Sequence, residues 1–419
     1  MKKIIMLLTA MMLISACASQ TPTNTPTASP QEKPTLTPVP TDTEMPFPPT
    51  ATTVALPELE TNCISVLPAP PADFEIKGTA LFLDGPMIVS MGEKALRIPI
   101  GAGEPSVSPH NKFLAYYGGD LLVTTSNGTV IRRVESNIVY ALVGDNWISD
   151  EYIRHLKLIS WEPLQYQLLV INMQTGESLD LRMDFPDMEE GGWRIENIAL
   201  YRNVTDAIYD PFLSRAAYPK KGSFISLYNV QEDREQAAIQ IEGGAPSWSP
   251  DGRYFTFKGW EQRAPREIYI ISRDGDQFMP LTYLATRYPE IIIGSYNWSP
   301  DSHKIAVWVN KEYKDKYESL FLFDFTTMKM RDVCIQGIGS WGSIIEAGLT
   351  SVSALPSSSG KYFDLGGRLV WSPDSTKIII AQFDEENQQV IDLLVDLERN
   401  LAYPIATGLE PMGWMSGEP

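Results

Sequence analysis

Histidine and cysteine, which often serve as catalytic groups or metal ligands, are scarce in this chain of 419 residues. Of its three histidines, His110 and His303 occupy turn segments and His155 follows one, so we expect turn residues rather than bases or ligands. The sequence contains no Gly-x-Ser-x-Gly elbow, no His-Glu-x-x-His, no phosphate-binding glycine loop and no Cys-x-x-Cys pair. This favours a protein that is not an enzyme and that has no cofactor.

Acidic side chains are more numerous, with 52 Asp and Glu against 34 Lys and Arg, and the formal net charge is −18 at pH 7. Such a charge disfavours nucleic acid or an anionic membrane surface as a partner. Asp274-Gly-Asp276 resembles the opening of a calcium loop, but no further Asp, Asn or Glu supplies the remaining oxygen ligands. We therefore interpret this segment as a hairpin turn and expect no metal site.

The most repeated polar motif is a phrase that precedes an apolar run three times. Its copies are Trp248-Ser-Pro-Asp-Gly-Arg253, Trp298-Ser-Pro-Asp-Ser-His303 and Trp371-Ser-Pro-Asp-Ser-Thr376. In each copy Pro presets φ for a turn and Asp can accept hydrogen bonds from nearby backbone N–H groups. An active site needs one such aspartate rather than one in every repeat, so we expect these aspartates to be structural.

The strands that follow these turns indicate the fold. Residues 254–258, 305–309 and 378–381 are apolar or aromatic at nearly every position, so both faces of these strands must be covered. Sheets that pack radially as propeller blades bury both faces of their middle strands, and each Trp is large enough to fill the gap between two blades. The repeat therefore predicts an all-β propeller.

The first copy continues into a second apolar strand from Arg266, an Asp-Gly turn and a closing Leu281-Thr282. With these features in order, the chain resembles the TolB-type β-propeller repeat, a relative of the WD-type repeats. The resemblance is specific over residues 245–282, good over 295–334 and 367–400, and weaker before 245. It implies four-stranded blades. Some relatives carry a serine-peptidase domain after the propeller, and we expect none here because the last strand ends close to Pro419.

The number of blades follows from weaker copies and from the chain ends. Three weaker copies occur at residues 105–117, 146–152 and 209–218. Residues 412–416 look like a first strand without a successor, whereas residues 78–90 and 95–100 look like later strands without a first one. Joining them completes one blade from both ends of the chain and closes the ring. We predict seven blades over residues 57–419, with six as the alternative because residues 140–240 are poorly marked.

The N-terminus has the pattern of an export signal. In residues 1–16, two lysines precede an apolar stretch from Ile4 to Ile14 that is too short to span a membrane. Ile14-Ser-Ala-Cys17 resembles a bacterial lipobox, which implies cleavage before Cys17 and lipidation of its thiol. An ordinary signal peptide with a coincidental cysteine is the alternative. We therefore predict a lipoprotein on the extracytoplasmic side of a bacterial membrane, anchored in the bilayer by this lipid alone.

A tether and two cysteines follow. Residues 17–56 are rich in Thr and Pro and have no periodic apolar face, so we predict a disordered tether. Beyond Cys17 only Cys63 and Cys334 remain, an even pair for an oxidising compartment. They either form a disulfide between the segment entering the ring and a late blade, or they are two separate buried thiols.

Loop lengths distinguish the two faces of the predicted ring. The Ser-Pro-Asp turns lie on one side, which we call the short-turn face. Longer segments, such as residues 259–266, 310–319 and 336–366, lie on the other, the long-loop face. Segments of this face carry Trp193, Trp260, Tyr313, Tyr317 and Trp341. Long loops are usually functional or disordered, so we predict that this face binds the ligand. The alternative is that each aromatic residue packs against its own loop.

Two functional hypotheses result. The first is a non-catalytic binding or scaffolding module whose partner is a protein, a peptide or an envelope glycan of the cell wall. The second is a hydrolase or lyase whose carboxylates converge on the central channel of the propeller. Residues of a channel come from different blades, so the repeat pattern leaves the second hypothesis open.

Overall fold

The Trp-Ser-Pro-Asp phrase folds into a tight turn between two strands. In the computed structural model, Ser249 Oγ donates a hydrogen bond of 2.7 Å to Asp251 Oδ1, which also accepts the backbone N–H of Arg253. Gly252 supplies the positive φ of +68° that the turn requires. The same Ser–Asp hydrogen bond occurs in the other two copies, Ser299–Asp301 and Ser372–Asp374. The repeated aspartates therefore hold their own turns.

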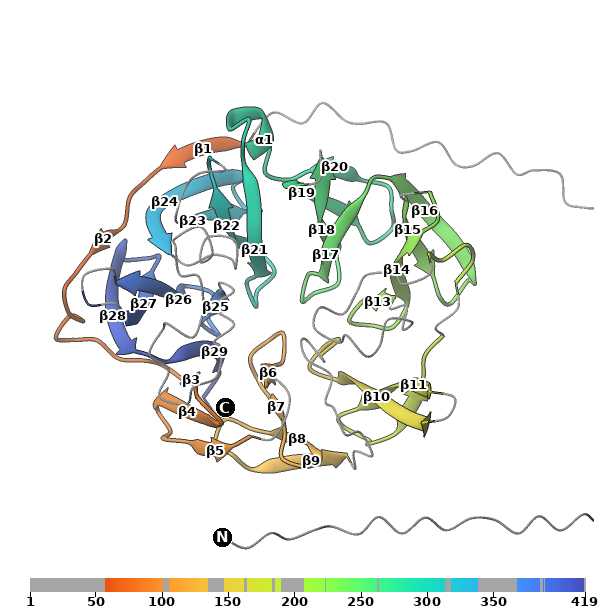
Figure 1. Ribbon diagram of the computed structural model, residues 1–419, viewed down its shortest axis with the longest axis horizontal. Coiled ribbons are helices and arrows are strands. Elements are labelled where there is room, and N and C mark those ends of the chain that lie inside the picture. Colours follow the sequence, from red (N-terminus) through yellow and green to blue (C-terminus); the bar gives the residue numbers. More distant parts are fainter. Residues whose placement is uncertain are drawn as a thin grey trace, which may run out of the picture. The chain divides into compact units, whose positions relative to one another are not determined.

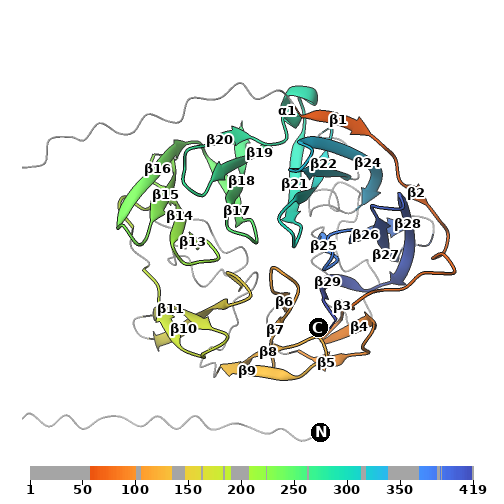
Figure 2. The same cartoon turned by 180° about the vertical axis from the view of Figure 1, so that it is seen from behind.

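Seven sheets surround a central axis, so the prediction of an all-β propeller with seven blades is confirmed and the alternative of six is wrong (Figures 1 and 2). The structure describes residues 57–100, 105–134, 147–161, 164–182, 185–189, 207–222, 224–261, 264–312, 318–337, 368–384, 387 and 389–417. In these residues the helix is α1 (Leu284–Arg287), between blades 5 and 6. No helix of the described segments is long and apolar enough to cross a membrane.

We number the blades along the ring and give their strands from the axis outward. Blade 1 contains β29 (Glu410–Met415), β3 (Thr79–Asp84), β4 (Met87–Gly92) and β5 (Arg97–Pro99). Blade 2 contains β6 (Ser106–Val107), β7 (Leu114–Tyr117), β8 (Leu121–Thr124) and β9 (Val130–Val134). Blade 3 contains β10 (Tyr152–Trp161), β11 (Leu164–Asn172) and β12 (Ser178–Asp180), and Trp147 is bridged to Ile153 in the position of a first strand.

The remaining blades follow the same order. Blade 4 contains β13 (Ile208–Tyr209), β14 (Arg215–Lys220), β15 (Phe224–Asn229) and β16 (Arg234–Gln240). Blade 5 contains β17 (Gly243–Trp248), β18 (Tyr254–Glu261), β19 (Ala264–Ser272) and β20 (Phe278–Pro280). Blade 6 contains β21 (Ile292–Trp298), β22 (Lys304–Asn310), β23 (Glu318–Asp324) and β24 (Lys329–Gly337). Blade 7 contains β25 (Val370–Trp371), β26 (Lys377–Asp384), β27 (Gln389–Asp396) and β28 (Leu401–Thr407).

The tryptophan of the phrase fills the boundary with the preceding blade. Trp248 is buried among Phe255 of its own blade and Ala217 and Ile225 of blade 4. Its Nε1 donates a hydrogen bond of 2.9 Å to the carbonyl oxygen of Ile208 in β13. A buried indole N–H needs such a partner. Blade 5 is thereby fixed to blade 4 by both an apolar and a polar contact.

The C-terminal strand closes the ring, as the sequence predicts. β29 pairs antiparallel with β3, and Trp414 lies opposite Ala80 in this pairing. Trp414 Nε1 donates a hydrogen bond of 2.8 Å to the carbonyl oxygen of Lys77. Beyond the strand, the N–H of Ser416 donates to the carbonyl oxygen of Asn111 in blade 2. Blade 1 is therefore built from both ends of the propeller.

A second closure lies on the outer rim and has no counterpart in the sequence predictions. Strand β1 (Glu58–Thr61) pairs in parallel with β24 of blade 6, and β2 (Ser65–Val66) pairs in parallel with β28 of blade 7. Figure 1 shows these orange-red strands running along the outside of the two blades. We call residues 57–67 the strap. Between its two strands, Cys63 forms a disulfide with Cys334 of β24.

Candidate functional site

The structure describes one of the five aromatic residues that we expect on the long-loop face. The other four, Trp193, Tyr313, Tyr317 and Trp341, lie outside the described residues. Trp260 lies on β18, opposite Pro265 of β19. The expectation of a long loop over residues 259–266 is therefore wrong. The two strands instead continue as an extended hairpin, because Trp260 and Glu261 find ladder partners in β19.

Trp260 combines a packed face and a free face. The backbone N–H of Trp260 donates a hydrogen bond of 2.9 Å to the carbonyl oxygen of Glu242, the residue directly before β17, which is the innermost strand of blade 5. The indole also lies over Gly244, where an added Cβ would be 3.2 Å from Nε1. Even so, 40% of the residue remains exposed. It is thus held in place by β17 while it presents an aromatic surface to solvent.

The short-turn face uses its polar groups for contacts between blades. Ser302 Oγ accepts the N–H of Asp251 at 3.0 Å, which joins blade 6 to blade 5. Ser375 Oγ accepts the N–H of Asp301 at 3.2 Å, which joins blade 7 to blade 6. Burial raises the pKa of Asp301, but the hydrogen bonds from Ser299 and from the backbone of His303 outweigh it and lower this pKa below its ordinary value. Asp301 is therefore an ionised structural element of its turn.

The histidines with described side chains belong to the same turns. The N–H of His110 in blade 2 donates to Asp150 Oδ1 in blade 3 at 3.1 Å, and its Nδ1 lies 3.3 Å from Asp150 Oδ2. Burial opposes the ionisation of Asp150, yet the hydrogen bonds from His110 and Ser108 lower its pKa to about 2. His303 follows its turn aspartate, and its side chain is exposed. His155 lies on β10, and its side chain lies outside the described part.

An exposed aromatic residue also occurs on the short-turn face. Phe212 follows β13, is 57% exposed and lies against Gly252 of the neighbouring turn. The guanidinium of Arg273 is 4.7 Å from the centre of its ring and 2.8 Å from the buried carboxylate of Asp210. This cation–π contact and ion pair account for the position of Phe212 within the fold.

A buried carboxyl group at the boundary between blades 7 and 1 was not predicted from the sequence. Asp392 on β27 is 0% exposed, and neither of its carboxyl oxygens accepts a hydrogen bond of normal geometry. Burial, and then the negative charge of Glu410 on β29, raises its pKa from 3.8 to about 8, against a smaller effect of the Leu409 N–H. The available signal was a lone acid in the apolar run of residues 390–395.

The chemistry open to Asp392 is limited by its burial. A carboxyl group that stays protonated near neutral pH suits a general acid. With no exposed surface, however, Asp392 cannot contact a substrate in this state.

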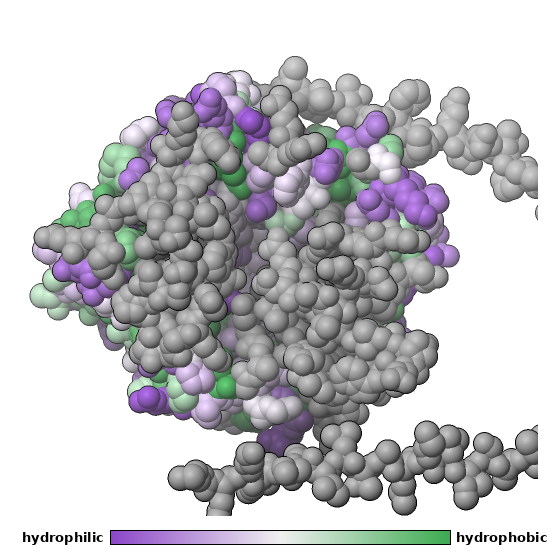
Figure 3. All heavy atoms as spheres, in the orientation of Figure 1, coloured by the Kyte–Doolittle hydropathy of each residue, from purple (hydrophilic) through white to green (hydrophobic). Residues whose placement is uncertain are grey.

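In the described segments no three His, Cys, Asp or Glu side chains come close enough together to hold a metal ion. Around the coloured part of Figure 3, hydrophilic and hydrophobic residues are mixed along the rim.

Comparisons with known proteins assign neither a family nor an activity to this chain. No protein-family model matches the chain. The uncharacterized peptidase YuxL of Bacillus subtilis (strain 168) is 29% identical over 126 residues, which are 27% of this chain. The chain spans 18% of the length of that peptidase. A match of this extent assigns no activity.

Three solved structures are similar at low identity. A TolB-like protein from Agrobacterium tumefaciens, described as putative TolB, has 13% identity and a TM-score of 0.38, with 63% of this chain and 90% of that chain covered. A protein from Lactobacillus plantarum has 11% identity and a TM-score of 0.44, with 81% and 98% covered. An oligogalacturonate lyase in complex with manganese has 13% identity and a TM-score of 0.42, with 71% and 78% covered. At these TM-scores the similarities assign no family or function, and the β-propeller is established by the seven sheets of the structure itself.

Proposed function

We propose that the propeller is a non-catalytic binding or scaffolding module on the extracytoplasmic side of a bacterial membrane. A lipid on Cys17 and the tether of residues 17–56 hold it there. Its ligand is a protein, a peptide or a cell-wall glycan. The Cys63–Cys334 disulfide supports this address, because disulfides persist in oxidising compartments and are rare in the cytosol. The net charge of −18 argues against nucleic acid.

The observation that carries the binding proposal is the exposed indole of Trp260. Its backbone is fixed by the β18–β19 hairpin and its ring rests on Gly244, so it can contact a ligand with little loss of conformational freedom. Tryptophan combines a large apolar face with an N–H donor, which suits both sugar rings and peptide side chains. The opposite face has its turn aspartates and serines already engaged with one another.

Photocrosslinking from both faces tests this proposal. The full lipidated chain is produced in its own envelope with p-benzoylphenylalanine in place of Trp260 and, as a matched control, in place of Phe212. Both residues are exposed and aromatic, and they lie in neighbouring blades on opposite faces. We expect a discrete adduct from position 260 and none from position 212. Equal crosslinking from both positions, or none from position 260, would refute binding at this face.

The adduct also identifies the ligand class. An adduct that loses mass on digestion with a muramidase contains cell-wall glycan, whereas one that yields foreign tryptic peptides contains a protein or peptide. With the ligand in hand, Trp260→Ala should weaken binding at least tenfold, as truncation of a central tryptophan commonly does.

The membrane anchor is tested separately, so that a negative result for lipidation does not bear on the proposal that the long-loop face binds the ligand. We expect Cys17→Ser to abolish labelling of the chain by radioactive palmitate and to move the protein from the membrane fraction to the soluble fraction. Labelling that persists in this variant would refute lipidation at Cys17.

The alternative is a hydrolase or lyase with a carboxylate-lined channel. Asp392 has the raised pKa that suits a general acid, but it lies on β27, the third strand of blade 7 from the axis, and not at the channel. If Asp392 acted as a general acid, Asp392→Asn would abolish turnover of a polysaccharide or peptide substrate while the protein stays folded. The complete burial of Asp392 favours a structural role, which predicts a change in stability instead.

A further inference from the structure

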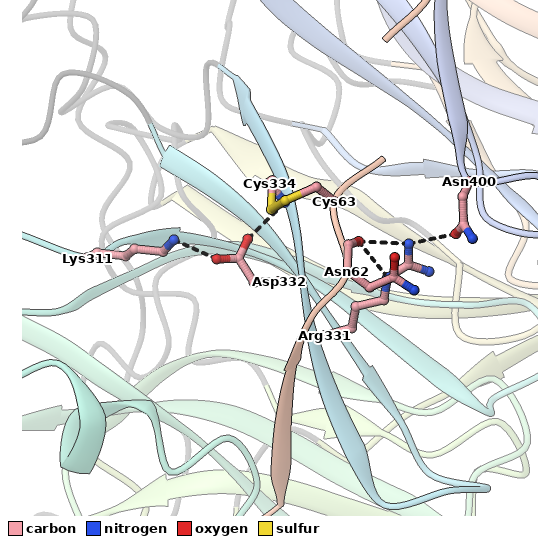
Figure 4. The surroundings of a disulfide bond; sticks show 7 residues. All are labelled: Asn62, Cys63, Lys311, Arg331, Asp332, Cys334 and Asn400. Atoms are coloured by element: carbon pink, nitrogen blue, oxygen red, sulfur yellow. Dashed lines mark hydrogen bonds and ion pairs between the residues drawn. A yellow bond between two sulfur atoms is a disulfide. The ribbon is translucent and has the colours of Figure 1, made fainter. Parts of the chain in front are cut away.

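The disulfide lies on the solvent side of the outer rim. Cys63 and Cys334 are both exposed, whereas the residues on either side of Cys334, Val333 and Ile335, are buried. Figure 4 shows the bond between the strap and β24, with Asn400 of blade 7 close by. Exposed disulfides are open to attack by thiolates, and they are the labile or regulatory ones more often than buried disulfides are.

A β-bulge turns Cys334 outward. Between Ser319 and Phe321, the register of β23 against β24 shifts, so β24 contains extra residues around Cys334. Cys334 adopts a positive φ of +59°, which is unfavourable for a residue with a Cβ. Asp332 Oδ1 accepts the N–H of Cys334 at 2.9 Å, and Asp332 Oδ2 lies 2.6 Å from Lys311 Nζ. The bulge thus points the sulfur at the strap, and this backbone is held by the buried carboxylate of Asp332, paired with half-buried Lys311, rather than by the ladder.

Directly beside the disulfide, the strap bridges the boundary between blades 6 and 7. Ile64 is buried in a cluster that contains Trp308 of blade 6 and Leu393 of blade 7. Arg331 of blade 6 donates hydrogen bonds to the carbonyl oxygen of Asn62 in the strap and to Asn400 Oδ1 in blade 7. The bond therefore lies where the strap passes from one blade to the next.

Besides the disulfide, the strap is held by two short ladders, by the buried side chain of Ile64, and by Arg287 and Arg331, whose guanidinium groups donate hydrogen bonds to its carbonyl oxygens. The ladder pairs are four in β1 and two in β2, and both strands lie largely exposed at the rim. Lys329 adds ion pairs to Glu58 and Glu60. The pairing of β29 with β3, by contrast, closes the ring without any residue of the strap.

We propose that Cys63–Cys334 is a reducible latch, a thiol-exchange site whose opening releases the strap from blades 6 and 7 while the ring stays closed. The reactant is a dithiol, such as the paired cysteines of a thiol oxidoreductase. Release uncovers the outer edges of β24 and β28, which the strap occupies in the closed state. Oxidation restores the latch.

The exchange balances in two steps. A thiolate of the dithiol attacks one sulfur of the pair, forms a mixed disulfide and displaces the other cysteine as a thiolate, which takes up a proton. The second thiol of the reductant loses its proton and attacks the mixed disulfide. The reductant leaves as its own disulfide, and the chain gains two electrons and two protons as two thiols.

Reduction of the folded protein tests the proposal. In a Cys17→Ser background, Cys63 and Cys334 are the remaining cysteines of the 419-residue chain. The purified chain is treated with dithiothreitol without denaturant, alkylated for mass spectrometry, and followed by amide hydrogen exchange. We expect both thiols to become alkylated and exchange of residues 62–67 to rise at least tenfold, while the amides of β3 and β29 stay protected over the same exchange times. Removal of the reductant in air should reform the disulfide and restore the original rate of amide hydrogen exchange in residues 62–67.

Three outcomes would overturn the proposal. They are a disulfide that resists dithiothreitol until denaturant is added, a strap whose exchange does not change on reduction, and a loss of protection over the whole ring within the same exchange times. The double variant Cys63→Ser with Cys334→Ser repeats the measurement without reductant. As a matched control, Lys329→Ala removes the ion pairs of β1 but keeps the bond. Its effect should stay within residues 58–61, and release of residues 62–67 by this variant alone would also refute the latch.

Discussion

Replacement of Asp392 by asparagine should stabilise the propeller at neutral and alkaline pH. The change keeps the size and shape of the side chain but removes its proton equilibrium. In the folded protein, burial and the charge of Glu410 raise the pKa of this carboxyl group from 3.8 to about 8. In the unfolded chain the same group ionises near pH 4. Between these values the folded state holds one proton more than the unfolded state.

The sign and size of the effect follow from this difference. A carboxyl group with a raised pKa lowers the free energy of unfolding as pH rises, by about 1.4 kcal/mol per pH unit between its unfolded and folded pKa values. At pH 7 the accumulated loss is about 4 kcal/mol, and it levels off near pH 8. Because asparagine has no such loss, Asp392→Asn should match the wild type at pH 4 and exceed it by about 4 kcal/mol at pH 7. For a domain of this size we expect a rise in Tm on the order of 5–10 °C.

The assay is thermal and urea denaturation of both proteins between pH 4 and pH 9. Asp396→Asn on the same strand is the matched control, because Asp396 is also buried but its Oδ1 accepts the N–H groups of Glu398 and Arg399. We expect it to gain no stability at any pH. In Glu410→Gln the pH-dependent loss should be smaller, since one cause of the raised pKa is gone. An Asp392→Asn protein that is less stable than the wild type at pH 8, or equally altered at pH 4 and pH 8, would refute this reasoning.

Three other substitutions probe the closures of the ring. Ser302→Ala leaves the N–H of Asp251 without its acceptor at the boundary of blades 5 and 6, and should lower the free energy of unfolding by about 1–3 kcal/mol in urea denaturation. An unchanged midpoint would show that this contact does not hold the blades. Gly413→Ala places a Cβ 2.2 Å from Val107 Cγ2, and the clash should cost about 1–3 kcal/mol in the same assay. Wild-type stability would mean that the inner strands of blades 1 and 2 separate easily. Cys334→Ser opens a loop with a sequence separation of 271 residues, which should cost about 5 kcal/mol in the chain-entropy model. Equal urea midpoints for this variant and the oxidised wild type would contradict that account.

The elements that were predictable from the sequence are those whose signals are local. Pro250, Asp251 and Gly252 form their turn through contacts within a few residues, so the sequence of the phrase is enough to predict the turn. The apolar strands behind the phrase require cover on both faces, and in an all-β chain radial packing of blades supplies it. The closing strand at residues 410–415 was recognisable because it carries a tryptophan, Trp414, which packs between blades 7 and 1 as Trp248 packs between blades 4 and 5.

Features that depend on distant partners left no readable pattern. The strap strands are short, and β1 and β2 are largely exposed at the rim, so they show no apolar periodicity. Their partners are sheet edges that exist only after blades 6 and 7 have formed. Asp392 is similar, because its raised pKa comes first from its burial in the folded ring and then from the charge of Glu410 across a blade boundary. The candidate site was predicted least well, since Trp260 was expected on a loop and lies on a strand.

The pairing of β29 with β3 also sets the order of events during synthesis. Strand β3 is among the first parts of the propeller to be made, yet it receives its inner partner from residues 410–415. The strap likewise cannot pair until residues 329–332 and 401–402 have been synthesised. Such distant pairing slows folding and leaves an apolar edge uncovered in the nascent chain. The ring therefore cannot close blade by blade from its beginning, and its completion is decided by its last strand.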